Sequence, residues 1–198
     1  MIPVFPTAYF GNILYFRSII LHLDVMIESK EHFIKQTYRN RTEILTANGV
    51  QQLSIPVIRK NGSKTVIEDV EISFETDWRK DHWKAIESAY SNSPYFEHYG
   101  SEVKELIYQN ETNLLKFNQN ILERVFSWLG IATTCTFNEN FGIDSLDSIT
   151  WPNKTRLYNP IETSKYVQVF GAPGEFEINL SILDAIFCEG PMTRKILI

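Results

Sequence analysis

WRKDHWKAIESAYSNSPYF, at Trp78–Phe96, is the segment from which the rest of the chain can be interpreted. It holds two Trp, two Tyr, one Phe and one His, which is more aromatic mass than a helix on the surface needs. His82, Ile86 and Tyr90 are spaced four residues apart, so on a helix they share one face. Pro94 forces the residue before it out of the helical region, which predicts a helix end there. We expect a deeply docked helix whose His82 face is either core or the wall of a site.

The chain before this helix begins with a pattern that predicts a βαβ unit. Val4–Phe10 is an apolar and aromatic run typical of a strand, and Ile13–Leu23 carries an apolar stripe at helical spacing. Val25–Ile27 then indicates a short buried strand. Because a strand, a helix and a second strand follow one another directly, the two strands should be parallel.

The clearest β signal lies between this unit and the helix. Lys30–Gln36 is polar and predicts a loop. Thr42–Thr46 and Gln51–Val57 then flank Asn48–Gly49, a dipeptide that tolerates positive φ at both positions of a tight hairpin turn. Val66–Phe74 alternates apolar and polar residues and predicts a further strand, so we expect a small antiparallel meander.

The remainder predicts a largely helical half. Asp77 should cap the helix that begins at Trp78, and Gly130 should end the longest helix, Asn113–Leu129. The later elements expected are helices at Tyr95–Gln109, Asn113–Leu129 and Leu180–Cys188, strands at Ala132–Phe137 and Tyr166–Phe170, and a polar loop at Asn138–Pro160. The fold class is therefore mixed α/β, with an N-terminal βαβ unit, a central antiparallel meander or hairpin and a helical C-terminal half, within one domain over residues 1–198.

The composition is that of an ordinary soluble protein. Of 198 residues, 43% are hydrophobic and 22% charged, with a net charge of -5. An acidic balance argues against nucleic acid as a partner, since that partner needs a basic surface. No run reaches the ~18 apolar residues of a membrane span. Two distant cysteines without a CxxC motif favour a reducing cytoplasm over a disulfide framework, and an oligomer is compatible with the sequence.

His82 is the candidate catalytic residue. Histidine is the side chain whose ordinary pKa lies near neutrality, so it suits a general base or acid. Asp81 is its neighbour in sequence, so on a helix it points about 100° away and is poorly placed to orient the ring. The alternative is a partly buried histidine that hydrogen-bonds the backbone.

A basic cluster, Lys35, Arg39 and Arg41, leads into the predicted hairpin. Arginine suits bidentate contact with phosphate or carboxylate, and on a strand Arg39 and Arg41 share one face. The functional interpretation is an anion site for a nucleotide or a phosphosugar. The alternative is a solvated edge strand on which the cations deter pairing with other chains.

Other chemistries find little support. Glu28, Glu31 and Asp24 could gather near His32, but no HExxH or HxH spacing fixes a metal site, so no metal ligands are assigned. Both cysteines occupy apolar patterns and should be core residues. The absence of GxGxxG, GxxxxGK[ST] and GxSxG excludes the ordinary Rossmann, P-loop and α/β-hydrolase interpretations, and the sequence specifies no cofactor.

Six blocks taken together resemble the WbqC-like protein family. In chain order they are AYFGNILYF at Ala8–Phe16, HLDVMIE at His22–Glu28, KQTYRNRTEI at Lys35–Ile44, NGVQQLSIPV at Asn48–Val57, WRKDHWKAIESAYSNSPYFEHY at Trp78–Tyr99 and LSILDAIFCEGP at Leu180–Pro191. The resemblance draws attention to Tyr9, Lys35, Asn40, Arg41, His82, Tyr90, Pro94, Tyr95 and Asp184.

The resemblance implies a bacterial cytosolic protein of surface-polysaccharide (O-antigen) assembly, in which an acyl or aminoacyl group is transferred to a nucleotide-activated sugar. In this hypothesis His82 is the base and faces Arg41 across a cleft between the helix and the hairpin. The residues expected to bind the substrate are Tyr9, Lys35, Arg39, Asn40, Arg41, Tyr90 and Tyr95. The alternative is a non-catalytic partner or scaffold of the same pathway, which would present the aromatic residues of Trp78–Phe96 on its surface.

Overall fold

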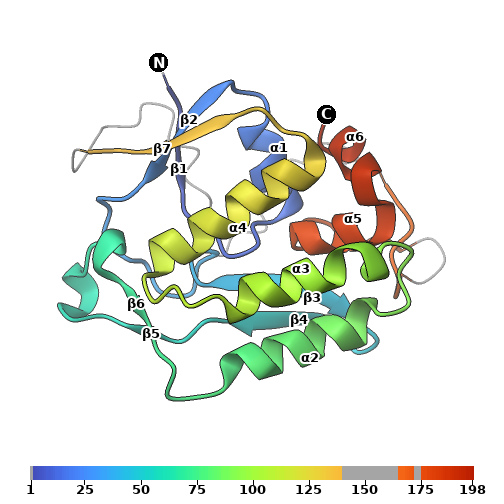
Figure 1. Cartoon of the computed structure of the whole chain (residues 1–198), viewed down its shortest axis with the longest axis horizontal. Helices are drawn as coiled ribbons and strands as arrows, with labels where there is room; N and C mark the ends of the chain where they lie inside the picture. Colours follow the sequence, from blue (N-terminus) through green and yellow to red (C-terminus); the bar gives the residue numbers. More distant parts are fainter. Residues whose placement is uncertain (1, 140–164, 172–174) are drawn as a thin grey trace.

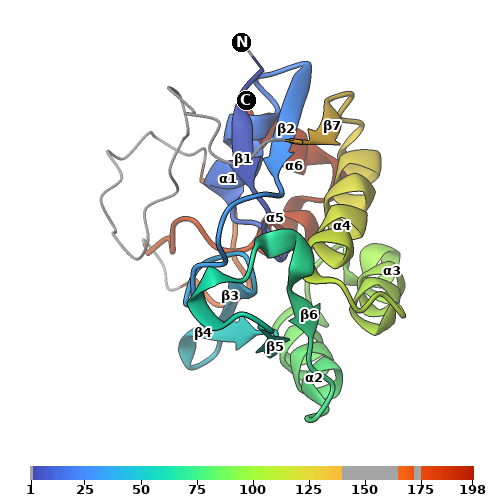
Figure 2. The same ribbon diagram turned by 90° about the vertical axis from the view of Figure 1, so that its left-hand side faces the viewer.

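The computed structural model describes residues 2–139, 165–171 and 175–198 (Figure 1). A parallel sheet lies at one end of the molecule together with both chain termini, and a β-hairpin and the helix α2 (Trp78–Tyr90) lie at the other end (Figures 1 and 2). The expected mixed α/β class, with a parallel unit and an antiparallel hairpin, is confirmed. The loop expected at Asn138–Pro160 falls, beyond Glu139, outside the described residues.

The N-terminal βαβ unit is present. Strand β1 (Val4–Pro6) pairs in parallel with β2 (Asp24–Glu28), and β7 (Thr134–Phe137) pairs in parallel with the other side of β2. Helix α1 (Ile13–Ile19) connects β1 to β2 and is capped by Asn12, whose Oδ1 accepts a hydrogen bond from the α1 backbone at 2.9 Å.

Strand β1 and helix α1 are both shorter than predicted. The strand ends at Pro6 because the following residues form a tight loop, in which Phe10 has a φ of 40° that no strand accommodates. The helix ends at Ile19, and the apolar residues Leu21 and Leu23 after it are 70% and 81% exposed. The apolar pattern of the sequence therefore extends beyond the helix, to residues whose side chains do not reach the core.

The hairpin consists of β3 (Arg41–Thr46) and β4 (Gly49–Ser54), with Thr46 opposite Gly49. The two turn residues are therefore Ala47 and Asn48, one position before the predicted Asn48–Gly49. The expectation of positive φ at both Asn48 and Gly49 is wrong, since only Gly49 has it, at 94°. The turn is held instead by the Thr46 hydroxyl, which donates to the carbonyl of Gly49 at 2.8 Å and accepts from the amide of Asn48 at 3.2 Å.

The predicted strand Val66–Phe74 is not one strand. Val66 makes an isolated bridge with His32, and the residues Ile67–Asp69 form a 3₁₀ turn. Only β6 (Glu71–Ile72) is a strand, and it pairs with β5 (Val57–Ile58) in a second two-stranded ribbon. Ile67 and Val70 are both fully buried because the turn directs them to the same side. The spacing of apolar residues that predicted a strand therefore reflects burial by a 3₁₀ turn.

The helices lie close to their predicted positions. They are α2 (Trp78–Tyr90), α3 (Phe96–Tyr108), α4 (Leu114–Leu129) and α5 (Ile182–Glu189). A further short helix, α6 (Thr193–Leu197), was not predicted. Gly130 ends α4 with a φ of 60°, as expected, whereas Asp77 makes no capping hydrogen bond through its side chain. The strand predicted at Tyr166–Phe170 is absent, because this segment is held by side-chain contacts instead of strand pairing.

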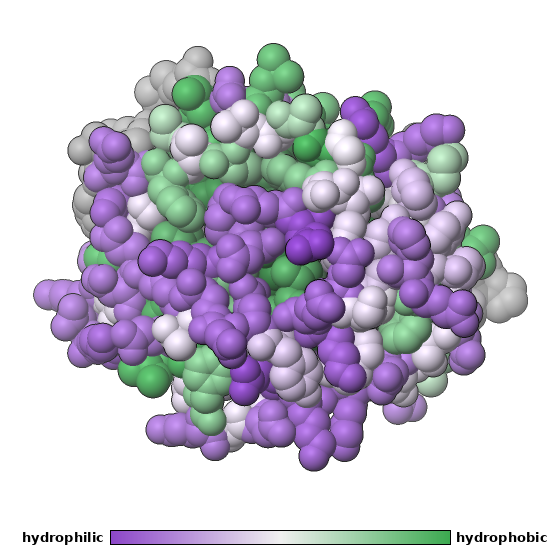
Figure 3. Space-filling model, in the orientation of Figure 1, coloured by the Kyte–Doolittle hydropathy of each residue, from purple (hydrophilic) through white to green (hydrophobic). Residues whose placement is uncertain are grey.

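One hydrophobic core joins the sheet, the hairpin and the helices. In the space-filling view, hydrophilic side chains spread over the face formed by α2, α3 and α4, while apolar ones gather toward the end with the sheet (Figure 3). Within the described part of the chain, no helix is long and apolar enough to cross a membrane.

Candidate functional site

His82 projects from α2 into the interior and meets Tyr9 in the loop after β1. The Tyr9 hydroxyl lies 2.9 Å from Nδ1 of His82, and the imidazole also hydrogen-bonds the backbone carbonyl of Ser54 at the end of β4. A neutral ring that accepts from Tyr9 and donates to Ser54 satisfies both contacts. The contact joins residues 73 positions apart, so it fixes α2 against the N-terminal loop.

Aromatic rings enclose this pair. The Trp78 ring meets the imidazole of His82 edge-on at 5.0 Å, and Phe117 lies 6.2 Å from the Tyr9 ring. His82 is 5% exposed and Tyr9 is fully buried. Burial lowers the pKa of His82 to about 4 and raises the pKa of Tyr9, so both groups are neutral at pH 7.

The loop that carries Tyr9 is held under backbone strain. Phe10 adopts a left-handed φ of 40° and is fully buried. Its carbonyl accepts hydrogen bonds from the hydroxyls of Thr42 on β3 and Ser181 before α5, both at 3.0 Å. Strained residues persist where the surroundings over-determine them, and they often mark functional sites.

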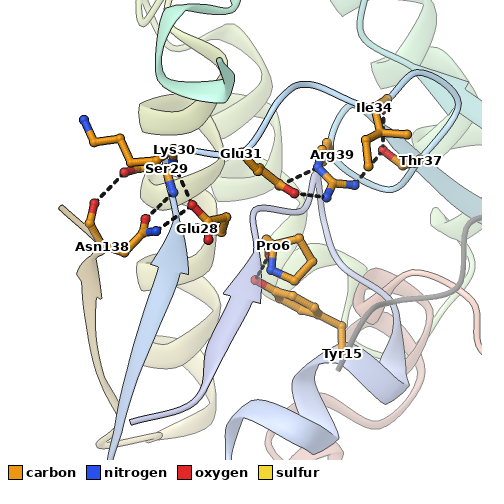
Figure 4. A network of polar contacts seen from close by, with 10 residues as sticks. All are labelled: Pro6, Tyr15, Glu28, Ser29, Lys30, Glu31, Ile34, Thr37, Arg39 and Asn138. Atoms are coloured by element: carbon orange, nitrogen blue, oxygen red, sulfur yellow. Dashed lines mark hydrogen bonds and ion pairs between the residues drawn. The ribbon is translucent and has the colours of Figure 1, made fainter. Parts of the chain in front are cut away.

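The three cations of the basic cluster have different environments. Lys35 is exposed. Arg39 is buried and makes a two-point ion pair with Glu31, through Nε at 2.6 Å and Nη2 at 2.5 Å, as Figure 4 shows. Because Glu31 already pairs with the guanidinium of Arg39, the role of Arg39 is structural.

Arg41 differs from both. It is half-buried, and its side chain makes no hydrogen bond or ion pair with any residue in the described ranges. Its Nε is buried and lacks a partner. A half-buried, uncompensated guanidinium is costly, which makes Arg41 the member of the cluster suited to an anionic ligand.

His82 and Arg41 border the same strand residue. Arg41 pairs with Ser54 across the hairpin, and the carbonyl of Ser54 accepts from His82. The two predicted residues are thus placed around one strand end, His82 on a closed side and Arg41 on a half-open one. A cleft between them, across which they face each other, remains a prediction.

Several buried polar atoms in this region lack partners. Two of the residues concerned contact the groups described above: Asn118 donates to the carbonyl of Arg39 at 2.8 Å, and Trp78 packs on His82. The unpaired atoms are Asn40 Oδ1, Arg41 Nε, Trp78 Nε1 and Asn118 Oδ1. Buried polar atoms are normally satisfied, so each such exception calls for an unseen water or ligand group.

Tyr90 forms a second buried polar cluster with Asp184. Its hydroxyl donates to Oδ1 of Asp184 at 3.0 Å, while Tyr166 and Gln168 donate to Oδ2 at 2.5 and 3.1 Å. Burial raises the pKa of Asp184, and the three donors oppose that effect. This cluster ties the segment around Gln168 to α5 and α2, so Tyr90 lies away from the pair of His82 and Tyr9.

The other predicted substrate-binding residues have structural contacts. Asn40 donates through Nδ2 to the carbonyl of Ile55 at 2.7 Å, which closes the base of the hairpin. Tyr95 is half-buried, and a Cβ added at Gly190 would lie 2.5 Å from its ring. The structure therefore brings Tyr9 and His82 into direct contact and places Arg41 opposite Ser54 in the hairpin. A single site that also includes Asn40 and Arg41 stays a prediction.

The surface proposed for a scaffold role is not exposed. Trp78 and Trp83 are 4% and 8% exposed, and Tyr95 and Phe96 are half-buried. Trp83 stacks on Phe96 at 6.0 Å, so the aromatic residues of α2 are mainly core. The expected aromatic patch is contradicted.

No metal centre is visible in residues 2–139, 165–171 and 175–198, where no three His, Cys, Asp or Glu side chains gather suitably. Glu31, weighed above as a ligand, is paired with Arg39, and Glu28 accepts from Asn138. Burial raises the pKa of the Cys135 and Cys188 thiols to about 12, which keeps them protonated at neutral pH.

Comparisons with known proteins identify the same family as the sequence blocks, five of which lie within the matched residues. A model of the WbqC-like protein family matches residues 7–172. A protein named uncharacterized protein Rv1507c, from Mycobacterium tuberculosis, is 31% identical over 127 residues, which are 64% of this chain and 52% of that protein. The chain thus spans about half the length of that relative. No solved structure matches.

Proposed function

The chain belongs to the WbqC-like protein family, and we propose that it is an enzyme that transfers an acyl or aminoacyl group to a nucleotide-activated sugar in surface-polysaccharide assembly. The single observation that carries the proposal is Arg41, whose half-buried guanidinium has no partner in the described part of the chain. In a protein of net charge -5, an unpaired and half-buried guanidinium is suited to bind an anionic substrate.

Arg41 would bind a phosphate or carboxylate of the substrate. The unpaired donor Trp78 Nε1 and the unpaired acceptors Asn40 Oδ1 and Asn118 Oδ1 would meet hydroxyl groups of the same ligand. A nucleotide-activated sugar offers both kinds of group, an anionic diphosphate and several hydroxyls.

His82 would take the proton from the attacking hydroxyl or amine of the sugar. The bond between that proton and its oxygen or nitrogen breaks as the new bond to the acyl carbon forms, and the leaving group of the acyl donor departs with its electron pair. Because Nδ1, the ring nitrogen that accepts, is occupied by the Tyr9 hydroxyl, the substrate must displace Tyr9 first. Tyr9 would then be free to position the substrate.

We expect Arg41→Gln to weaken binding of a nucleotide sugar about 10- to 100-fold, since one charge-assisted hydrogen bond contributes about 1.5–3 kcal/mol. Thermal-shift screening of the purified protein with UDP-glucose and related nucleotide sugars, alone and with acyl or aminoacyl donors, identifies the ligand by its rise in melting temperature. Titration of both proteins with that ligand gives the two affinities.

Lys35→Gln is the matched control, because it removes a nearby exposed cation and should leave the affinity unchanged. Equal affinities of the wild type and Arg41→Gln would contradict the proposal. A loss of affinity in Lys35→Gln alone would place the anion on the surface instead.

A further inference from the structure

A groove of about 500 Å³ opens where β2 and β7 end. Both strands are parallel neighbours, so their carboxyl ends meet at the same edge of the sheet. In α/β proteins, ligands bind preferentially outside the carboxyl ends of parallel strands, and the volume is in the range of small-molecule sites. The groove is also bordered by the 3₁₀ turn Ile67–Asp69 and the start of α4.

The floor of this groove is rigid. Asn138, just after β7, accepts from the amide of Ser29 at 2.5 Å and donates to Glu28 Oε1 at 2.5 Å (Figure 4). The Ser29 hydroxyl donates to the carbonyl of Asn138 at 2.7 Å, and both residues are 3% exposed. These bonds join the ends of the two strands, so the shape of the groove is set before any ligand arrives.

The walls combine charge with one exposed aromatic ring. Lys30 and Glu68 form an ion pair at 2.5 Å. Asp69, Lys116 and Glu139 also line the groove and are exposed, so the lining carries three carboxylates and two ammonium groups. Phe137 contributes a ring that is 41% exposed.

This lining does not suit a phosphate group. The carboxylates outnumber the lysines, and Lys30 is already paired. The first amides of α4 are also engaged: that of Lys116 donates to Asn113 Oδ1 at 3.0 Å, and that of Leu114 donates to the carbonyl of Val70 at 3.0 Å. These two amides of α4 are therefore not available to bind an anion.

We infer that the groove binds a neutral, hydroxyl-rich ring, that is, a sugar. Carboxylates accept hydrogen bonds from hydroxyl groups, and ammonium groups donate to them. The apolar face of such a ring packs on an exposed phenyl ring, here Phe137, which the fold otherwise leaves in water. None of the groove residues belongs to the Arg41 region, so the inference does not rest on the proposed transferase activity.

The test is an NMR titration of the ¹⁵N-labelled protein with glucose, galactose and N-acetylglucosamine, and separately with inorganic phosphate. We expect at least one sugar to produce saturable shifts at the amides of Lys30, Glu68 and Asn138, with a Kd on the order of millimolar. Phe137→Thr should weaken that binding at least about fivefold, because packing area on the ring is lost. The spectra also report whether the variant is folded.

Phe170→Thr is the matched control, since Phe170 is 38% exposed outside this groove. A second variant, Glu139→Gln, should also lower the affinity for the sugar. The inference is overturned if no sugar produces saturable shifts of these amide resonances, or if phosphate alone shifts them. It is also overturned if both groove variants bind the sugar with the affinity of the wild type. Arg41→Gln should leave sugar binding unchanged, so failure here is separable from failure of the proposed function.

Discussion

Replacing Glu31 by Gln is expected to lower the free energy of unfolding by about 3 kcal/mol, because it leaves the buried guanidinium of Arg39 without its counter-charge. The side chains of Arg39 and Glu31 are 9% and 22% exposed, and two contacts, at 2.6 and 2.5 Å, join them. The remaining partner, the hydroxyl of Thr37, lies 3.2 Å away and carries no charge. Urea unfolding at pH 7 measures the difference.

The matched control is Glu68→Gln, which removes the counter-charge of Lys30. These two side chains are 39% and 28% exposed, so solvent screens their attraction and the loss should stay below about 1 kcal/mol. A loss in Glu31→Gln no larger than that in Glu68→Gln would show that Arg39 does not depend on its partner, and Arg39 would again be a candidate for binding substrate.

Acidification is the second large effect, and it acts through His82. The pKa of His82 falls to about 4 in the folded protein, against 6.5 for the ordinary residue. Between these values the unfolded chain binds a proton that the folded chain does not, so stability falls as the pH falls. The difference corresponds to about 3 kcal/mol lost between pH 7 and pH 4.

His82→Gln isolates this contribution, because a glutamine can still accept from Tyr9 and donate to Ser54 but does not titrate in this range. Urea unfolding at pH 7, 5.5 and 4 should show the wild type losing about 3 kcal/mol more than the variant. Asp184 titrates in both proteins, so its effect cancels. The exposed His98 supplies the control, since His98→Gln should behave as the wild type. Parallel curves for the wild type and His82→Gln would refute a buried neutral imidazole.

Much of the fold could be predicted because its signals are local. The βαβ order predicted the parallel pairing of β1 with β2, and Asn48–Gly49 marked the hairpin turn. Helix α2 was recognised from its spacing and from Pro94. What failed were elements set by tertiary contacts: Val66–Phe74 buries its apolar residues through a 3₁₀ turn, and Tyr166–Phe170 is held by a buried carboxylate.

The candidate site was only partly predictable, since the sequence lists residue types and not their partners. It singled out Arg39 and Arg41 equally, and only the structure shows that Glu31 occupies one of them. Asn118 gave no signal, because it is one polar residue within the apolar pattern of α4. The order of parallel strands also lay beyond the sequence, so the groove at the ends of β2 and β7 could not be foreseen.

The central claim is that Arg41 and His82 belong to one binding site. The most direct measurement is a ¹⁵N NMR titration of the His82 ring with the nucleotide sugar that gives the largest rise in melting temperature. The ring resonances should shift as the ligand displaces a contact of His82, with the same Kd as the melting data. In Arg41→Gln the same shift should require about 10- to 100-fold more ligand. Tight binding that leaves the His82 resonances unchanged in the wild type would contradict the claim.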